Sequence, residues 1–123
     1  MEMKIFGLAE LLRVALKPLE TRAAAVFIYG SIAKHPDLAH DVADIMIIAE
    51  GLTLTDVIPD LIKAEAAAGC KINPSLYSVA ELRRKLAGGN SYFITLMKQP
   101  RIFLIGSEEI ISGKRMIPPL PSS

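Results

Sequence analysis

Apolar and polar residues alternate along this chain with two different periods. Between residues 5 and 19, leucine and alanine recur every three or four positions, and charged residues occupy the other side. This spacing predicts an amphipathic helix. Residues 24–29 and 43–49 are instead short apolar runs, and the second run is continuously apolar after Asp44. Such runs indicate strands that are buried on both faces, as central or parallel strands are.

Cap and stop signals define the next part of the chain. Thr53 or Thr55 can cap a helix that ends near residue 68, because Gly69 can adopt the left-handed conformation that closes a helix. Residues 71–77 predict a third strand. Pro74 confines this strand to an edge or a bulge, because proline donates no backbone hydrogen bond.

The remaining elements are short. Residues 78–81, with the sequence Ser-Val-Ala-Glu, form a capping box that predicts the start of a helix. Asn90 or Ser91 can cap another helix. The expected elements are helices at 79–87 and 92–98, a strand at 101–105 and a helical turn at 108–111.

This order of elements predicts an α+β fold, a mixed sheet of about four strands packed against helices. No internal repeat or linker interrupts residues 5–112. We therefore expect one domain over residues 1–112 and a proline-rich, extended tail over residues 113–123. A length of 123 residues suits a single core.

Composition excludes several classes of protein. With 14 basic and 13 acidic residues, the net charge of +1 creates no field that would favour nucleic acid. No apolar run approaches the roughly 20 residues that cross a bilayer, so no membrane partner is expected. The single cysteine, Cys70, excludes a disulfide framework and a cysteine zinc site. The N-terminus lacks the features of a signal peptide, so a cytoplasmic location is expected.

The candidate chemistry lies between residues 26 and 50. Gly30 and Ser31 directly follow the first predicted strand, and a turn of this kind can direct backbone N–H groups at a phosphate. Asp44 opens the second strand, where a carboxylate can hold a metal ion. Taken alone, the glycine-serine pair is equally compatible with a simple chain reversal.

Residues 27–34 (FIYGSIAK) and 41–48 (DVADIMII) resemble the signature of the polymerase-beta-like nucleotidyltransferase superfamily, in particular its small prokaryotic members. That signature is a strand, Gly-Ser, a small and a basic residue, a loop, and then Ser-Asp-x-Asp opening an apolar strand. Residues 52–77, 80–93 and 98–106 are also similar to such domains, which in other proteins follow a winged-helix region. No dedicated DNA-binding region is expected in this chain.

The resemblance implies an activity and a set of ligands. It places the phosphates of a nucleoside triphosphate at Gly30 and Ser31, with Lys34 as a phosphate contact, and Mg²⁺ at the acidic residues. The implied reaction transfers a nucleoside monophosphate to a hydroxyl acceptor. It also implies a helical protein partner of the toxin–antitoxin kind. The high apolar content of residues 5–19 and 92–97 makes these segments the expected surface for such a partner or for a homodimer.

The chain departs from the signature at its acidic residues. Asp44 matches the second acid, but the first acid falls on Val42, and the serine before it falls on Asp41. Asp41 and Asp44 are three residues apart, so a regular strand would point them to opposite faces, and a bulge would be needed to join them at a metal site. The position of a third acid falls near Asn73.

Two hypotheses therefore remain open. In one, the chain is a transferase with Asp41 and Asp44 as catalytic metal ligands. In the other, it is an inactive module that binds nucleotide or a protein, as an antitoxin or regulatory partner does. The direction of the Asp41 carboxylate discriminates between them.

Three other features each have a structural and a functional interpretation. His35 and His40 suit an exposed loop better than a metal pair. The basic cluster of Arg83, Arg84 and Lys85 is better interpreted as the solvated face of a helix than as a nucleic-acid-binding patch. Cys70 is better interpreted as a small residue at the start of a strand than as a nucleophile, because no sequence neighbour would lower its pKa.

Overall fold

The computed structural model describes residues 3–35 and 40–112, and the predicted tail lies outside this part of the chain. Its centre is a four-stranded sheet in the order β3-β2-β1-β4. The strands are β1 (Ala25–Tyr29), β2 (Val42–Ile48), β3 (Lys71–Tyr77) and β4 (Ile102–Ile105). β1 pairs antiparallel with β2 and β4, whereas β2 and β3 are parallel. The predicted α+β class and mixed four-stranded sheet are confirmed.

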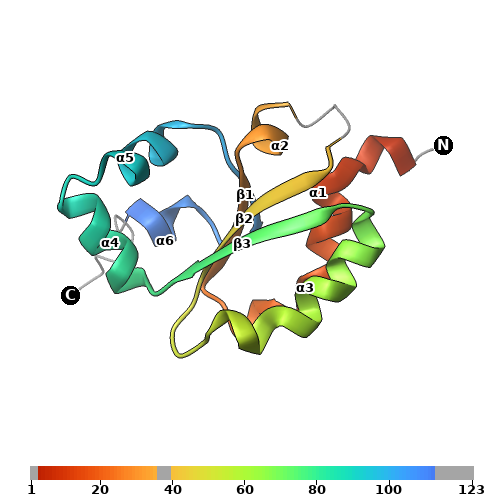
Figure 1. The fold of residues 1–123 in the computed structure, drawn as a ribbon, viewed down its shortest axis with the longest axis horizontal. Coiled ribbons are helices and arrows are strands. Elements are labelled where there is room, and N and C mark those ends of the chain that lie inside the picture. Colours follow the sequence, from red (N-terminus) through yellow and green to blue (C-terminus); the bar gives the residue numbers. More distant parts are fainter. Residues whose placement is uncertain (1–2, 36–39, 113–123) are drawn as a thin grey trace, which may run out of the picture.

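Helices cover both faces of the sheet, as Figure 1 shows. α1 (Met3–Ala15) and α3 (Leu54–Ala68) lie on one face, and α4 (Val79–Ala87), α5 (Ser91–Lys98) and α6 (Glu108–Ser112) lie on the other. Alternate residues of each strand therefore enter two separate cores. Val26, Ile45 and Ile47 pack toward α1 and α3. Phe27 and Met46 pack toward Leu82 of α4 and the α5 residues on the other face.

The predicted helix over residues 5–19 is wrong at its C-terminal end. α1 stops at Ala15, and a 3₁₀ helix, η1 (Lys17–Thr21), follows it. Pro18 explains the change, because proline disfavours the α-conformation in the preceding residue and donates no N–H bond. Leu12, Leu16 and Leu19 nevertheless remain fully buried, so the apolar stripe still faces the core.

α3 is bounded by the signals that the sequence contains. Thr53 caps it through a capping box with Asp56, and Gly69 closes it with a φ of +72°. Pro59 lies inside the helix with its ring in an exposed position. The buried positions are Val57, Leu61 and Ala64.

β3 is an edge strand, and its free edge is blocked at two points. The N–H of Ile72 donates to the Glu65 carboxylate of α3 over 2.7 Å, away from β2. N–H groups on this side of a strand recur every second residue, so the next position is Pro74, which has none. The edge therefore offers few donors to a further strand, which is how natural sheets prevent edge-to-edge pairing.

Within the described residues, no helix combines the length and apolar character that crossing a membrane requires. No buried side-chain nitrogen or oxygen in the same ranges lacks a hydrogen-bond partner.

Candidate functional site

The predicted phosphate turn joins the end of β1 to a short helix. Gly30 has a φ of +75° and a ψ of −143°, a conformation that is essentially restricted to glycine, and α2 (Ser31–Lys34) follows directly. The first N–H groups of a helix have no acceptor within it, so those of Ser31 and Ile32 point away from α2 at its start. α2 lies at one end of the sheet, beside the start of β2 (Figure 1).

Asp44 lies beside this turn. It is the register partner of Tyr29, the last residue of β1, so its side chain reaches Gly30. A Cβ atom placed on Gly30 would be only 2.6 Å from the Asp44 Oδ2 atom. Glycine is therefore required at this position for two independent reasons, its conformation and the carboxylate beside it. The structure brings Gly30 and Asp44 together as the sequence pattern predicts.

Asn73 holds the other carboxylate oxygen of Asp44. Its Nδ2 atom donates a hydrogen bond of 3.0 Å to Asp44 Oδ1. The two residues face each other in the parallel β2–β3 register. The position at which the sequence suggested a third acid thus lies next to Asp44, but it provides an amide.

A polar cluster that the sequence did not reveal adjoins Asp44. Tyr29, a residue that is 9% exposed, has Ser75 of β3 and Tyr92 of α5 as polar neighbours of its hydroxyl. Burial raises the pKa of Tyr29 to about 12, and the neighbouring Tyr92 and Asp44 add to the increase, while the Ser75 hydroxyl opposes it. The phenol is therefore neutral at physiological pH. Tyr92 itself is 55% exposed, with its ring edge against Phe93.

Val42 and Asp41 lie on different sides of β2. Val42 is two residues from Asp44, so the strand period places it on the same face, where 46% of its surface is exposed. Asp41 precedes the strand and lines an open hollow with Glu65, Cys70 and Lys71, beside the end of α3. Its carbonyl oxygen accepts a bond from the N–H of Lys71, so no bulge turns it toward Asp44. The structure does not bring the carboxylates of Asp41 and Asp44 together.

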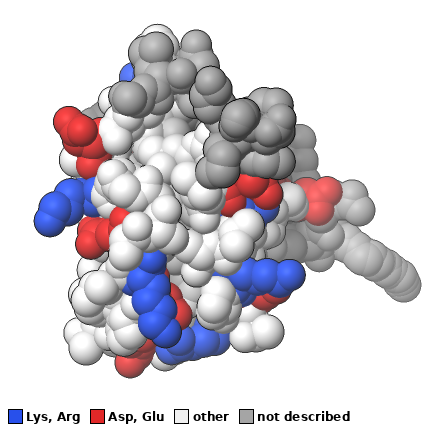
Figure 2. Space-filling model, turned by 90° about the vertical axis from the view of Figure 1, so that its right-hand side faces the viewer, with Lys and Arg blue, Asp and Glu red and all other residues white. Residues whose placement is uncertain are grey.

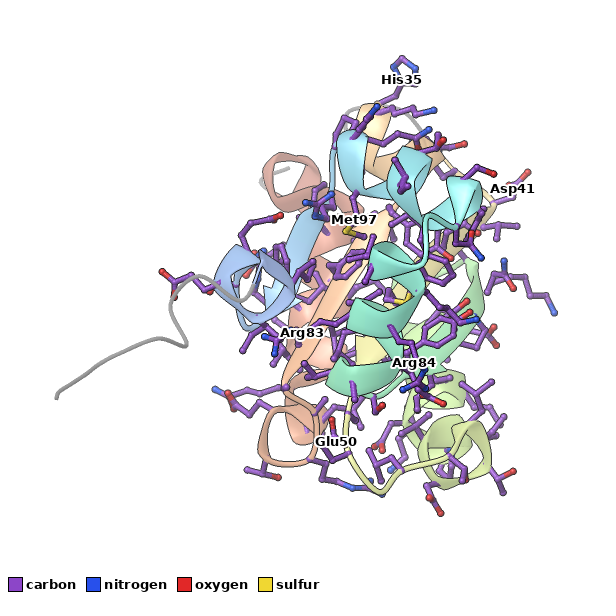
Figure 3. The ribbon with its side chains drawn as sticks, turned by 90° about the vertical axis from the view of Figure 1, so that its left-hand side faces the viewer. His35, Asp41, Glu50, Arg83, Arg84 and Met97 are labelled. Atoms are coloured by element: carbon purple, nitrogen blue, oxygen red, sulfur yellow. The ribbon has the colours of Figure 1, made fainter. Side chains whose placement is uncertain are left out.

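Ser31 and Lys34 are both exposed on α2. Lys34 ends the helix, and its backbone N–H donates to the carbonyl oxygen of Gly30 over 3.1 Å. His40 approaches the carbonyl oxygen of His35 at 2.7 Å through Nε2, so its ring contacts backbone. Figure 3 shows His35 and Asp41 at one end of the molecule and Glu50 at the opposite end.

The basic cluster on α4 contacts its own fold. Arg83 donates to the carbonyl oxygen of Ile110 in α6, whereas Arg84 lies on the other side of α4 (Figure 3). Lys85 lies 5.9 Å from the centre of the Tyr77 ring and 5.7 Å from that of Phe93. Two of the three cations are therefore partly engaged in holding α4 to its neighbours. Burial raises the pKa of the Cys70 thiol, and the Glu65 charge adds to the effect, which disfavours a nucleophilic thiolate.

Comparisons with known proteins leave the family open. The chain matches no protein-family model, and no curated protein matches it either. The resemblance to nucleotidyltransferases therefore stays a prediction, carried by residues 27–34 and 41–48.

The donors at this end of the sheet do not suit a pair of magnesium ions. Among the described residues, no three His, Cys, Asp or Glu side chains lie close enough to hold a metal ion. At the turn, the described residues provide one carboxylate, Asp44, and one amide, Asn73, and these two are bonded to each other. Magnesium in phosphoryl-transfer sites is held by carboxylates together with substrate phosphates.

The sequence contained only part of the signal for this site. The spacing predicts Gly30, Ser31 and Asp44. It gives no signal for Tyr29 or Ser75, because their positions relative to Asp44 depend on the register of β1 and β3 against β2, which no local pattern encodes.

Proposed function

We propose that this chain is a nucleotidyltransferase-fold protein that binds a nucleoside triphosphate at the turn formed by Gly30 and Ser31 and has lost metal-dependent transfer. The observation that carries the proposal is the neighbourhood of Asp44. On its face of the sheet the adjacent positions are Val42, Met46, Tyr29 and Asn73, none of which is a carboxylate, and Asp41 lies on the α3 side.

Phosphate binding and catalysis have different requirements at such a site. Binding needs N–H donors and positive charge, and we assign these roles to the start of α2 and to Lys34, which is exposed in the last turn of that helix. Transfer additionally needs charge stabilisation of the leaving pyrophosphate, for which metal ions on two aligned carboxylates are the usual means. A valine at the first position removes one of these carboxylates without disturbing the turn. The role of the protein is then recognition, of nucleotide and of the partner that responds to it.

Calorimetric titration of the protein with ATP, GTP, CTP, UTP and inorganic tripolyphosphate, with and without magnesium, tests the binding. We expect at least one nucleoside triphosphate to bind, and Lys34→Ala to weaken it. Lys17→Ala is the matched control and should leave the affinity unchanged, because Lys17 is exposed in η1, which leads into the start of β1, at the opposite end of that strand from Gly30. Absence of binding by every nucleotide would refute the proposal and leave protein interaction as the remaining role.

A second experiment tests the loss of transfer. Incubation with labelled nucleoside triphosphates, magnesium and candidate acceptors should label nothing beyond the level of an Asp44→Ala variant. Val42→Asp restores a carboxylate two residues before Asp44 on the same strand face, so this variant should bind Mn²⁺ or Mg²⁺ more tightly than the natural chain. Labelling by the natural chain that disappears in Asp44→Ala would show that the chain is an active transferase.

A further inference from the structure

Tyr92, near the start of α5, is an aromatic side chain that the core leaves accessible. It is 55% exposed, whereas its neighbour Phe93 is buried in the core beneath α4 and α5. The two rings meet edge to face, with 5.1 Å between their centres and 88° between their planes. A flat aromatic surface of this kind is a common contact for a planar ligand, because it provides a large apolar area with few rotatable bonds.

Tyr92 is separate from the exposed apolar surface of α3. Leu54, Ile58 and Ile62 project from α3, on the other face of the sheet. Figure 2 views the molecule from that side and shows uncharged residues across the middle of the face, with charged residues around them. Ile94 is 37% exposed, but it is two residues from Tyr92, about 200° around α5. A single exposed apolar residue needs no explanation by itself, so what distinguishes Tyr92 is its location.

The location of Tyr92 connects it with the candidate site. Side chains alternate between the faces of a strand, so Asp44 points to the same face as Met46, which packs beneath α4 and α5. A nucleotide beside Asp44 would therefore lie on the side of the sheet that α5 covers. Tyr29, the residue before the turn, belongs to the same core, and its hydroxyl has Tyr92 and Ser75 as neighbours.

The span between the turn and Tyr92 fits the length of a nucleotide. Ser75 is on β3, two strands from β1 in the sheet order, and neighbouring strands are about 4.8 Å apart. The Tyr29 side chain therefore extends across β2, and Tyr92 adjoins its far end. This arrangement puts Tyr92 on the order of 10 Å from the turn. In a nucleoside triphosphate, the α-phosphate and the ribose separate the base from the terminal phosphates by a comparable length.

Two contacts fix the support of the Tyr92 ring. Asn90 caps α5 by accepting a hydrogen bond of 3.2 Å from the N–H of Phe93. Phe93 in turn packs edge to face against Tyr77 of β3, with 5.2 Å between the ring centres. The ring beneath Tyr92 is therefore held to the sheet. A side chain supported in this way loses little conformational freedom when a base stacks on it, which favours binding.

We propose that Tyr92 stacks on the base of a nucleoside triphosphate whose phosphates bind at the turn, and that this contact favours purines. The inference rests on the proposed function, because Gly30 and Ser31 define where the phosphates lie. Stacking on an aromatic side chain tolerates every base, since each has a π-face. The two fused rings of a purine cover more of the tyrosine than the single ring of a pyrimidine, so more apolar area is buried. ATP and GTP should therefore bind more tightly than CTP and UTP.

Calorimetric titration of Tyr92→Ala with the four nucleotides and inorganic tripolyphosphate tests the contact. We expect the variant to bind ATP and GTP about tenfold more weakly than the natural chain does, with a smaller loss for CTP and UTP. Its affinity for tripolyphosphate should be unchanged, because tripolyphosphate has no base. Tyr92→Phe keeps the ring and should keep the affinity for ATP. Ile94→Ala is the matched control, since Ile94 is exposed on another side of α5.

Tyrosine fluorescence gives a second readout, because the chain contains three tyrosines and no tryptophan. Saturating ATP should quench the emission of the natural chain, since a stacked base quenches the ring beneath it, and Tyr92→Phe should show less quenching. Inorganic tripolyphosphate is the control for changes that the phosphates alone produce.

The outcomes distinguish the two proposals. Absence of binding by every triphosphate refutes the proposed function, and the stacking contact with it. ATP binding that Lys34→Ala weakens but Tyr92→Ala does not would leave the proposed function in place and overturn the stacking. Equal losses of affinity for ATP and tripolyphosphate in Tyr92→Ala would also overturn it, because the side chain would then act on the phosphates or on the fold. Equal affinity of the natural chain for purine and pyrimidine nucleotides would overturn the purine preference. Circular dichroism shows whether each variant is folded.

Discussion

Substitution of Gly30 by alanine tests the closest contact at the candidate site. In the natural chain, where Asp44 is present, the substitution has two free-energy costs. The first is conformational, because φ of +75° with ψ of −143° belongs to a region that side chains avoid, at about 1–3 kcal/mol. The second is steric, because the new Cβ would lie 2.6 Å from Asp44 Oδ2.

The steric cost can be estimated from what Asp44 would lose. To make room, its carboxylate must rotate away, which breaks the 3.0 Å bond from Asn73, at about 1 kcal/mol. Gly30→Ala should therefore destabilise the protein by roughly 2–4 kcal/mol in total. In an Asp44→Ala background only the conformational cost remains, so the double-mutant cycle should give a coupling free energy of about 1 kcal/mol.

Urea unfolding of the four proteins measures this cycle. Stability changes appear as shifts of the midpoint at constant slope. Gly69→Ala is the matched control, because Gly69 has a φ of +72° but no atom within 4 Å of the added Cβ, so its cost should be about 1–2 kcal/mol in either background. Additivity of Gly30→Ala and Asp44→Ala to within about 0.3 kcal/mol would refute the proposed contact.

Three further predictions follow from the packing and the titration of the fold. Leu12→Ala should lower the free energy of unfolding in urea by about 2–5 kcal/mol, because Leu12 is fully buried. Leu11→Ala, at a side chain that is 37% exposed, should lower it by less than about 1 kcal/mol. Equal losses of stability would show that α1 is rotated. Thr53→Ala should cost about 1 kcal/mol, through loss of the side-chain cap of α3, and an unchanged midpoint would contradict the capping box. In an ultraviolet titration of the folded protein, one tyrosine should ionise only near pH 12, and Tyr29→Phe should remove that step. The folded pKa of Tyr29 exceeds its ordinary value of 10.0, so the contribution of Tyr29 to stability is complete below about pH 10 and is lost as the pH rises to about 12. The difference in unfolding midpoint between the natural chain and Tyr29→Phe should therefore change over this pH range, and a constant difference would contradict the prediction.

The sequence by itself determined the elements and most of their ends. The β3 and α4 ranges agree with the prediction residue for residue, because Pro74, the Ser78 capping box and Gly69 act through local backbone chemistry. The one helix that was extended too far, α1, ends early for a reason that is also local, the presence of Pro18. Periods and caps predicted the type of every strand and of the longer α-helices within the described residues, but not the 3₁₀ helix η1.

The spacing of a strand, a turn and a second strand also singled out Gly30 and Asp44 as candidate site residues, and the β1–β2 register then brings them together. Three results belong to the tertiary structure. Strand register placed Tyr29 and Asn73 beside Asp44, and Ser75 two residues beyond Asn73 on β3, although Tyr29 and β3 are far apart in the chain. The regular start of β2 left Asp41 on the α3 side. The packing of α3 decided which of its apolar residues face the core and which are exposed. Local patterns specify which face of an element is apolar, but only the packed chain decides what each face meets.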